Sequence, residues 1–209
     1  MNSKILSEKV EAVRQFRLSS KAKTTNGYAK VPQLFAQITQ PDDVDFLIIP
    51  SVSSERRRYV PIGFATSDVI SSNAVQIVPN ATLYHFGVLT SNVHMAWMRA
   101  VCGRLEMRYR YSKEIVYNTF PWPNPTDAQK AKVEQTAQAI LDARALYSDC
   151  SFADMYGEKM YLFPELLKAH QNNDRAVMQA YGFSKEHPAY SSESACVAEL
   201  MKMYQNLTE

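Results

Sequence analysis

Glycine is scarce in this 209-residue sequence, and its six glycines stand far apart. No two of them form a G-x-G string. The loops that bind dinucleotides or S-adenosylmethionine, and the P-loop that cradles phosphates, need clustered glycines so that the backbone can approach the ligand. The sequence therefore excludes a nucleotide-fold catalytic site within the chain itself.

Apolar runs long enough to span a membrane are also missing, so we expect no membrane contact. The polar N-terminus has no apolar segment followed by a small-residue cleavage site, which argues against a secretory signal. The cysteines are few, odd in number and far apart: Cys102, Cys150 and Cys196. Such usage is typical of a reducing cytoplasm rather than of a disulfide framework.

Catalytic signatures are missing too. No lysine follows an acidic residue by two positions, as the metal-binding motif of PD-(D/E)xK nucleases requires. The string Asn118-Thr119-Phe120-Pro121 lacks the paired prolines that shape the amine-gripping loop of amino-methyltransferases. The histidines show no metal-ligand spacing, and we expect them to be structural, with His85 in an apolar strand. We therefore expect no catalytic residue, metal ligand or cofactor in this chain.

What the sequence does have is an uneven distribution of charge. The net charge of +2 divides into +2 for residues 1–52, +5 for residues 53–113 and −5 for residues 114–209. Seven of the eight central cations are arginines, whose planar fork suits phosphates and base edges. We therefore expect the middle of the chain to face a polyanion, with an ordinary charged surface as the competing interpretation.

The hydrophobic pattern predicts a helix over residues 3–18 and then a basic, turn-rich connector. Four strands separated by Pro and Asn turn signals are expected at Phe46–Ile49, Tyr59–Phe64, Val75–Val78 and Leu83–Leu89. A helix capped by Ser91 or Asn92 follows, and Gly103 is placed to end it. Its predicted buried residues are Val93, Trp97, Ala100 and Val101.

After that helix, the segment RLEMRYRYS (104–112) is predicted to be extended, and the proline-rich PWPNPTD from Pro121 to form a rigid connector. A capping box of Thr126 and Gln129 predicts the next helix. Its expected buried residues are Val133, Ala137, Ile140, Leu141 and Leu146. Two more helices are expected, from Pro164 to near Gly182 and from about Ser192.

Strands followed by helices predict an α+β fold, in which a mixed or antiparallel, strand-rich domain carries a helical C-terminal appendage. We expect three parts: a helical connector over residues 1–45, a strand-rich domain over residues 46–123 and a helical domain over residues 124–209.

Glu106, Arg108 and Arg110 form the group of side chains that is the candidate binding site. At alternate positions of an extended segment they share one face, while Tyr109 and Tyr111 occupy the other. In the major groove of DNA, arginine bonds guanine O6 and N7, and glutamate accepts from the cytosine amino group. The pattern therefore favours a base-reading face, although a solvated edge strand whose charges block aggregation would look the same.

Phosphate contacts give a DNA reader its orientation without sequence information. The neighbouring residues suited to that role are Arg56, Arg57, Arg58, Arg104, Ser112 and Lys113.

Several strings resemble the target-recognition region of the MmeI-like restriction–modification enzymes, and with their flanks they cover nearly the whole chain. The strings in that region are SSERRRYVPIGF (53–64), IVPNATLYHFGVLTS (77–91), MAWMRAVCGRLEMRYRYS (95–112) and IVYNTFPWP (115–123). The flanking strings are VEAVRQFRLSSKAKT (10–24), AILDARALY (139–147) and ELLKAHQNNDRAVMQAYG (165–182).

This resemblance implies a large bacterial polypeptide in which a nuclease, a helical spacer and an adenine-N6 DNA methyltransferase precede the present chain. S-adenosylmethionine and Mg²⁺ would be bound in those parts, and residues 1–45 would follow the methyltransferase domain. The implied partners are that domain and double-stranded DNA. By motif, the family's base-reading positions fall on Glu106, Arg108 and Arg110, and a further one falls near Ala74. The competing hypothesis is a protein-interaction module without DNA contact.

Overall fold

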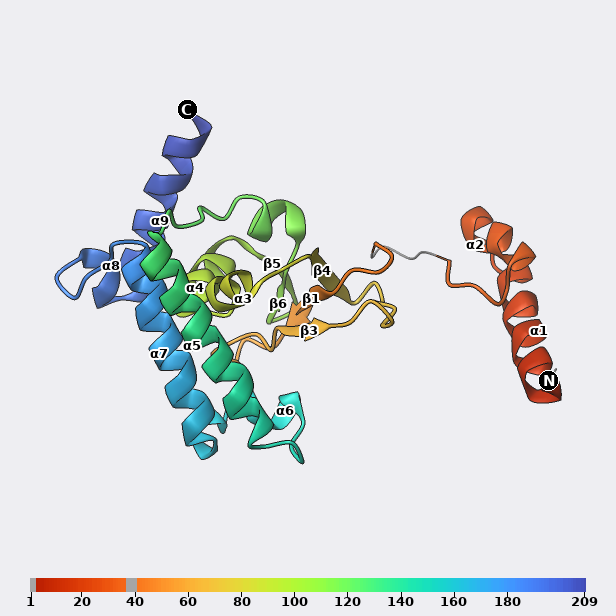
Figure 1. The fold of residues 1–209 in the computed structure, drawn as a ribbon. Coiled ribbons are helices and arrows are strands. Elements are labelled where there is room, and N and C mark those ends of the chain that lie inside the picture. Colours follow the sequence, from red (N-terminus) through yellow and green to blue (C-terminus); the bar gives the residue numbers. More distant parts are fainter. Residues whose placement is uncertain (1–2, 37–40) are drawn as a thin grey trace. The chain divides into compact units, whose positions relative to one another are not determined.

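The structure, a computed structural model, describes residues 3–36 and 41–209. The chain divides into two compact units, Met1–Thr39 and Gln40–Glu209 (Figure 1). The larger unit holds two small sheets and most of the helices, and it contains every residue that the sequence singles out for DNA contact.

The smaller unit is helical, and the helix predicted over residues 3–18 is confirmed. Its elements are α1 (Lys4–Leu18), α2 (Lys23–Gly27) and the 3-10 helix η1 (Tyr28–Lys30). None of the described residues of α1 is buried. Arg17 connects the elements of this unit instead. Its guanidinium donates to the carbonyl oxygens of Tyr28 over 2.9 Å, Val31 over 3.0 Å and Leu34 over 2.8 Å.

The first sheet of the larger unit is antiparallel, with β1 (Phe46–Pro50) between β3 (Gly63–Ala65) and β4 (Val75–Pro79). Two of the predicted strands, β1 and β4, are thus confirmed. The strand predicted over Tyr59–Phe64 is largely wrong, because pairing there is confined to β3. Pro61 has no N–H to donate to a ladder, so the residues before β3 are buried without pairing as a strand.

The second sheet is also antiparallel, with β6 (Arg108–Arg110) between β2 (Val52–Ser53) and β5 (Gly103–Leu105). The segment 104–112 is therefore not one extended strand, as predicted, but most of a hairpin. The chain reverses at Glu106, whose φ of 57° lies in the left-handed region that permits a tight turn.

The strand predicted over Leu83–Leu89 is wrong, because these residues form helix α3 (Leu83–Leu89). A capping box starts the helix: the Thr82 backbone N donates to His85 Nδ1 over 3.1 Å, so His85 is a helix-capping residue rather than a strand residue. The helix is buried on most sides, which removes the amphipathic period from its sequence. Short apolar runs of this kind do not distinguish strand from helix.

Helix α4 (Asn92–Val101) is confirmed, with Ser91 at its N-cap accepting from the His94 backbone N over 3.4 Å. Two details differ from the prediction. Ala100 is exposed. The helix ends at Cys102, whose backbone is extended, so Gly103 begins β5 instead of forming a left-handed cap.

The irregular proline connector and the helix after it are confirmed, since Thr126 and Gln129 make both bonds of a capping box at the start of α5 (Asp127–Ala145). Leu146 lies beyond that helix and is exposed rather than buried. Gly182 has a φ of 75° just after α7. The remaining elements are the π-helical turn η2 (Lys113–Tyr117), α6 (Phe152–Met155), η3 (Met160–Leu162), α7 (Pro164–Ala180), α8 (Pro188–Ser191) and α9 (Glu193–Thr208).

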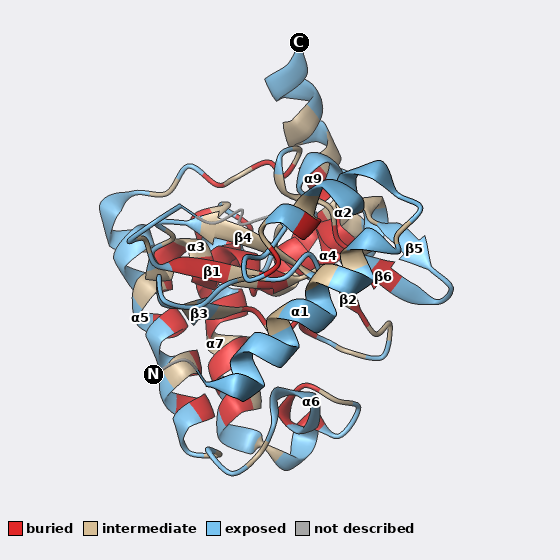
Figure 2. Cartoon of the chain, turned by 90° about the vertical axis from the view of Figure 1, so that its right-hand side faces the viewer, coloured by how far each residue is buried: buried red, intermediate tan, exposed pale blue. Residues whose placement is uncertain are grey.

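The C-terminal helices and the strands share one core. Helices α5 and α7 lie side by side (Figure 1), and buried residues gather on β1, α4 and α7 (Figure 2). Buried hydrogen bonds cross from these helices to the earlier part of the chain: Asn173 Nδ2 donates to the Gly87 carbonyl over 2.8 Å, and Arg144 Nη1 donates to the Ile62 carbonyl over 2.8 Å. Tyr109 and Tyr111, the inward side chains at the second sheet, also belong to this core.

Candidate nucleic-acid interface

The β5–β6 hairpin has two distinct faces. Leu105 pairs with Arg108 and Gly103 with Arg110, so these four side-chain positions share one face of the ladder. Arg108 and Arg110 are exposed, whereas Tyr109 and Tyr111 are only 8% and 3% exposed. The predicted alternation of outward arginines and inward tyrosines thus holds along β6 and the residue that follows it.

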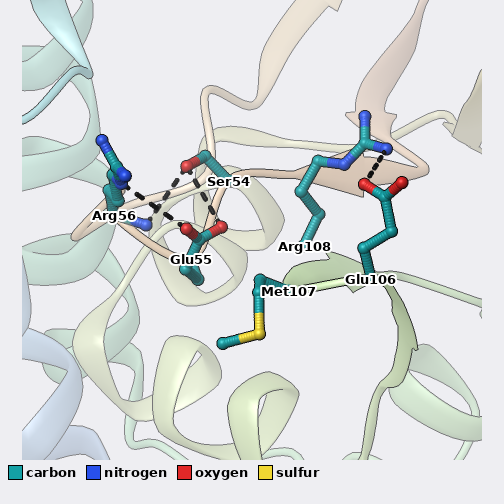
Figure 3. A pocket seen from close by; sticks show the side chains of 6 residues that line it. All are labelled: Ser54, Glu55, Arg56, Glu106, Met107 and Arg108. Atoms are coloured by element: carbon teal, nitrogen blue, oxygen red, sulfur yellow. Dashed lines mark hydrogen bonds and ion pairs between the residues drawn. The ribbon is translucent and has the colours of Figure 1, made fainter.

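Glu106 does not lie on the strand face where it was predicted. It occupies the hairpin turn, from which its carboxylate accepts a hydrogen bond from Arg108 Nη2 over 2.9 Å (Figure 3). The two side chains are 79% and 46% exposed, respectively. An ion pair with this exposure contributes about 0–1 kcal/mol, so the Arg108 fork can exchange it for another acceptor. The structure therefore keeps Glu106 and Arg108 together, although not as neighbours on one strand.

Ala74 is linked through Ser51 to the inner end of the hairpin. The Ser51 backbone N donates to the Ala74 carbonyl oxygen over 2.9 Å, and the Ser51 carbonyl accepts from the Tyr111 backbone N over 2.9 Å. Ser51 connects β1 to β2, so it joins the two sheets. Ala74, an exposed residue that precedes β4, and Tyr111, which follows β6, therefore flank Ser51 at this junction.

The three consecutive arginines occupy the turn after β2 and differ in their contacts. Arg56 is paired with the carboxylates of Glu55 at 3.6 Å and Glu158 at 3.0 Å. Arg58 extends over the Tyr59 ring, with 5.4 Å between its guanidinium carbon and the ring centroid. Arg57 is half-buried, and no ion pair joins it to another residue that the structure describes.

A shallow hollow of about 330 Å³ separates this arginine turn from the tip of the hairpin (Figure 3). Its lining includes three residues that the sequence interpretation missed: Ser54, Glu55 and Met107. Ser54 and Glu55 directly precede the three arginines, and Met107 lies between Glu106 and Arg108. Their positions in the sequence suggested that they lie near the site, but their side chains carry no signal typical of DNA contact. The other lining residues are Arg56, Glu106 and Arg108.

The other predicted phosphate contacts are spread around the hairpin. Arg104 pairs across the ladder with Tyr109, and its guanidinium carbon lies 4.2 Å from that ring's centroid, on the face opposite Arg108. Ser112 caps η2 by accepting from the Ile115 backbone N over 3.3 Å. Lys113 is exposed, 3.7 Å from the Glu114 carboxylate.

Buried polar groups anchor the interior side of this surface. Tyr111 Oη lies 3.0 Å from His94 Nε2, and burial lowers the pKa of His94 to about 3, so the imidazole is neutral. Asp174 accepts from the Tyr59 hydroxyl over 2.6 Å and from the Asn92 backbone N over 2.8 Å. Burial raises the pKa of Asp174 to about 6. These contacts connect the arginine turn and α4 to α7.

The histidines in the described part of the chain either cap helices or are buried. His85 and His187 accept backbone N–H groups at helix starts, and His94 and His170 are buried. Within residues 3–36 and 41–209, no three His, Cys, Asp or Glu side chains are grouped to hold a metal. None of the described helices is long and apolar enough to cross a membrane.

The fold is that of a target-recognition region. The chain belongs to the MmeI family: residues 1–124 match the MmeI target recognition domain, and residues 125–209 match the MmeI C-terminal domain. This finding confirms the resemblance drawn from the sequence.

Two longer proteins are similar to the chain. It is 34% identical over 205 residues to DNA methyltransferase A of Bacillus subtilis (strain 168), covering 98% of this chain and 22% of that protein. It also superimposes with a TM-score of 0.87 on the type IIL restriction–modification enzyme MmeI, solved in complex with DNA. That match has 46% identity and covers 98% of this chain and 26% of the solved one.

Proposed function

We propose that this chain recognises a specific base sequence in double-stranded DNA on behalf of a longer restriction–modification polypeptide. The observation that carries the proposal is the direction of Arg108 and Arg110, which project outward from a strand whose inner tyrosines are buried. Two guanidinium forks on one face of an edge hairpin suit bidentate bonds to guanine O6 and N7 in the major groove. The solved relative's complex with DNA supports the same role.

Within this proposal, the surrounding residues divide between base and phosphate contact. Glu106 accepts from a cytosine amino group or orients Arg108, and Ala74 limits which base fits beside β6. Phosphates are held by Arg57, Arg58 and Lys113 around the hairpin, with Arg56, Arg104 and Ser112 contributing where their present partners are exchanged. In this division, the base contacts determine which sequence is bound, and the phosphate contacts determine the orientation of the protein on the duplex.

A further partner in our proposal is the methyltransferase domain of the longer polypeptide. The described part of the smaller unit has large apolar side chains that are more than half exposed: Ile5, Leu6, Phe16, Leu34 and Phe35. Such a concentration in a short helical segment suits contact with another domain. S-adenosylmethionine, which supplies the methyl group, and Mg²⁺ for cleavage would be bound by domains outside this chain, in the bacterial cytoplasm where the DNA lies.

The division of labour along the chain is also part of the proposal. Residues 1–45 connect to the methyltransferase, residues 46–123 present the reading surface, and residues 124–209 brace it. The meeting point of the two family domains at residues 124 and 125 supports this division.

The test is selection of duplexes from a pool with randomised base pairs, followed by titration of the selected duplex with salt. We expect enrichment of one sequence and a binding constant that falls linearly with salt on logarithmic axes, with a slope near −0.9 per neutralised phosphate. Duplex binding without any enrichment would contradict sequence-specific recognition and indicate a surface that binds polyanions non-specifically. Absence of duplex binding would favour the protein-interaction module.

A further inference from the structure

The direction of the outer arginines depends on what holds the inner side of β6. This strand is short and sits in a small sheet, pairing with Val52–Ser53 on one side and with Gly103–Leu105 on the other. The residues of β5 are all exposed. Short ladders fix the rotation of a strand weakly, so buried side chains must set the direction of the outward ones.

Tyr111, which follows Arg110 directly, is one such anchor. Its backbone N donates to the Ser51 carbonyl over 2.9 Å, and its hydroxyl lies 3.0 Å from His94 Nε2. The ring is 3% exposed. Ser51 therefore holds the backbone of Tyr111 and His94 holds its side chain, at the point where the chain leaves β6.

His94 is itself tightly held on α4. It is fully buried, and the Phe120 ring packs edge-on against it with 4.5 Å between ring centroids. Its Nδ1 has no hydrogen-bond partner among the described residues, so the Tyr111 hydroxyl provides the hydrogen bond of this imidazole. The buried hydrogen bond thus connects a rigid helix to the end of β6.

The same anchor extends to Ala74. The Ser51 residue that accepts from Tyr111 also donates to the Ala74 carbonyl oxygen over 2.9 Å. Ala74 and Tyr111 thus flank the same residue, and a shift of Tyr111 against Ser51 changes the placement of Arg110 relative to Ala74, two positions that the proposed function assigns to base contact.

We propose that His94 and Tyr111 are a positioning pair that sets Arg110 against Ala74 in the reading surface, an inference that rests on the proposed function. Neither side chain reaches DNA, because both are buried. They act through Arg110, and their loss should therefore reduce discrimination between sequences while leaving phosphate contacts unchanged.

The test compares Tyr111→Phe with wild type in the full chain. Binding is measured to the duplex selected by wild type and to a scrambled duplex of equal length and composition. We expect the ratio of the two affinities to fall about tenfold, through weaker binding of the selected duplex. The relaxed base pair should be the one that Arg110→Ala also relaxes. Tyr84→Phe is the matched control, because its buried hydroxyl has no hydrogen-bond partner in the described chain.

An unchanged ratio for Tyr111→Phe, or an equal loss in Tyr84→Phe, overturns the inference. A wild-type chain that enriches no sequence overturns the proposed function instead, and this inference with it. If Tyr111→Phe does not fold, His94→Gln and His94→Leu replace it. The glutamine amide can reach the Tyr111 hydroxyl and should preserve more discrimination than leucine, and equal discrimination by the two variants contradicts the pairing.

Discussion

Single residues on this surface differ in how firmly their present partners hold them. Arg108 shares an exposed ion pair with Glu106, which DNA can replace at a cost of about 0–1 kcal/mol. Arg56 contacts two carboxylates, and Arg104 covers the Tyr109 ring. Arginines of similar sequence context are therefore not equivalent, and the least restrained ones suit direct contact with DNA.

Arg108→Ala and Arg57→Ala should separate base contact from phosphate contact. Loss of Arg108 removes a bidentate bond, so binding to the selected duplex should weaken by about 1–3 kcal/mol and preference should relax at one base pair. Loss of Arg57 should weaken all duplexes alike and reduce the salt slope by about 1. Fluorescence anisotropy on selected and scrambled duplexes measures both effects. Identical behaviour of the two variants would contradict the assigned roles.

Buried titratable residues make stability depend on pH. Burial lowers the pKa of His94 from 6.5 to about 3 and lowers that of His170 well below its usual value. Protons bind these histidines more readily in the unfolded chain, so the free energy of unfolding should fall as pH drops below about 6.5, by at most ~1.4 kcal/mol per pH unit for each. Asp174 acts in the opposite sense, since burial raises its pKa from 3.8 to about 6.

Asp174→Asn should therefore steepen the acid loss of stability between about pH 6 and pH 4, because the folded state no longer gains a proton there. Urea unfolding at successive pH values measures the slope. Asp149→Asn, at an exposed position, should leave the slope as it is in wild type. A slope that Asp174→Asn does not change would show that this carboxyl is not protonated in the folded chain.

At the scale of elements, local capping signals predicted the starts of α4 and α5, whereas the strands depended on contacts distant in sequence. The Thr126–Gln129 box and Ser91 are short-range signals and are confirmed. The α3 segment failed because its faces are covered by other elements, so no amphipathic period survives in its sequence. The hairpin failed at Glu106, a non-glycine residue in a left-handed turn.

Gly87→Ala tests the close packing of α3 against α5. A Cβ at this position would lie 2.7 Å from Val133 Cγ1 and 3.1 Å from Asn173 Oδ1. We expect a net destabilisation of about 1–3 kcal/mol, because overpacking exceeds the helix-propensity gain of about 1 kcal/mol. Thermal and urea unfolding measure it. Gly63→Ala is the control, since its added Cβ meets its nearest atom at 3.7 Å. Greater stability of Gly87→Ala would refute the tight contact.

At the scale of the whole molecule, the C-terminal family domain and residues 40–124 of the target recognition domain together form one compact unit, Gln40–Glu209. The sequence indicated a change from strands to helices after the prolines. The interdependence of the two parts was not visible, because it depends on pairs such as Tyr59–Asp174 and Ile62–Arg144 that are far apart in the chain. The same limit applied to the site: Ala74 is linked to Tyr111 through Ser51, which no local pattern indicates.

A chain truncated after residue 124 should therefore fail to fold, although it contains the whole target recognition domain match. Truncation exposes the apolar core that α5 and α7 cover and leaves the buried Tyr59 hydroxyl without its partner. Circular dichroism and amide NMR dispersion distinguish the outcomes. A truncated chain with a cooperative unfolding transition would show that the C-terminal helices are dispensable for the fold.

The central claim is that Arg108 reads a guanine in the major groove. It is tested most directly by replacing each guanine of the selected duplex, one at a time, with 7-deazaguanine, which lacks the N7 acceptor. We predict that one replacement weakens wild-type binding about tenfold and has no further effect on Arg108→Ala, because the bond to N7 is already lost. If every replacement leaves wild-type affinity unchanged, or weakens wild type and Arg108→Ala equally, the claim is contradicted.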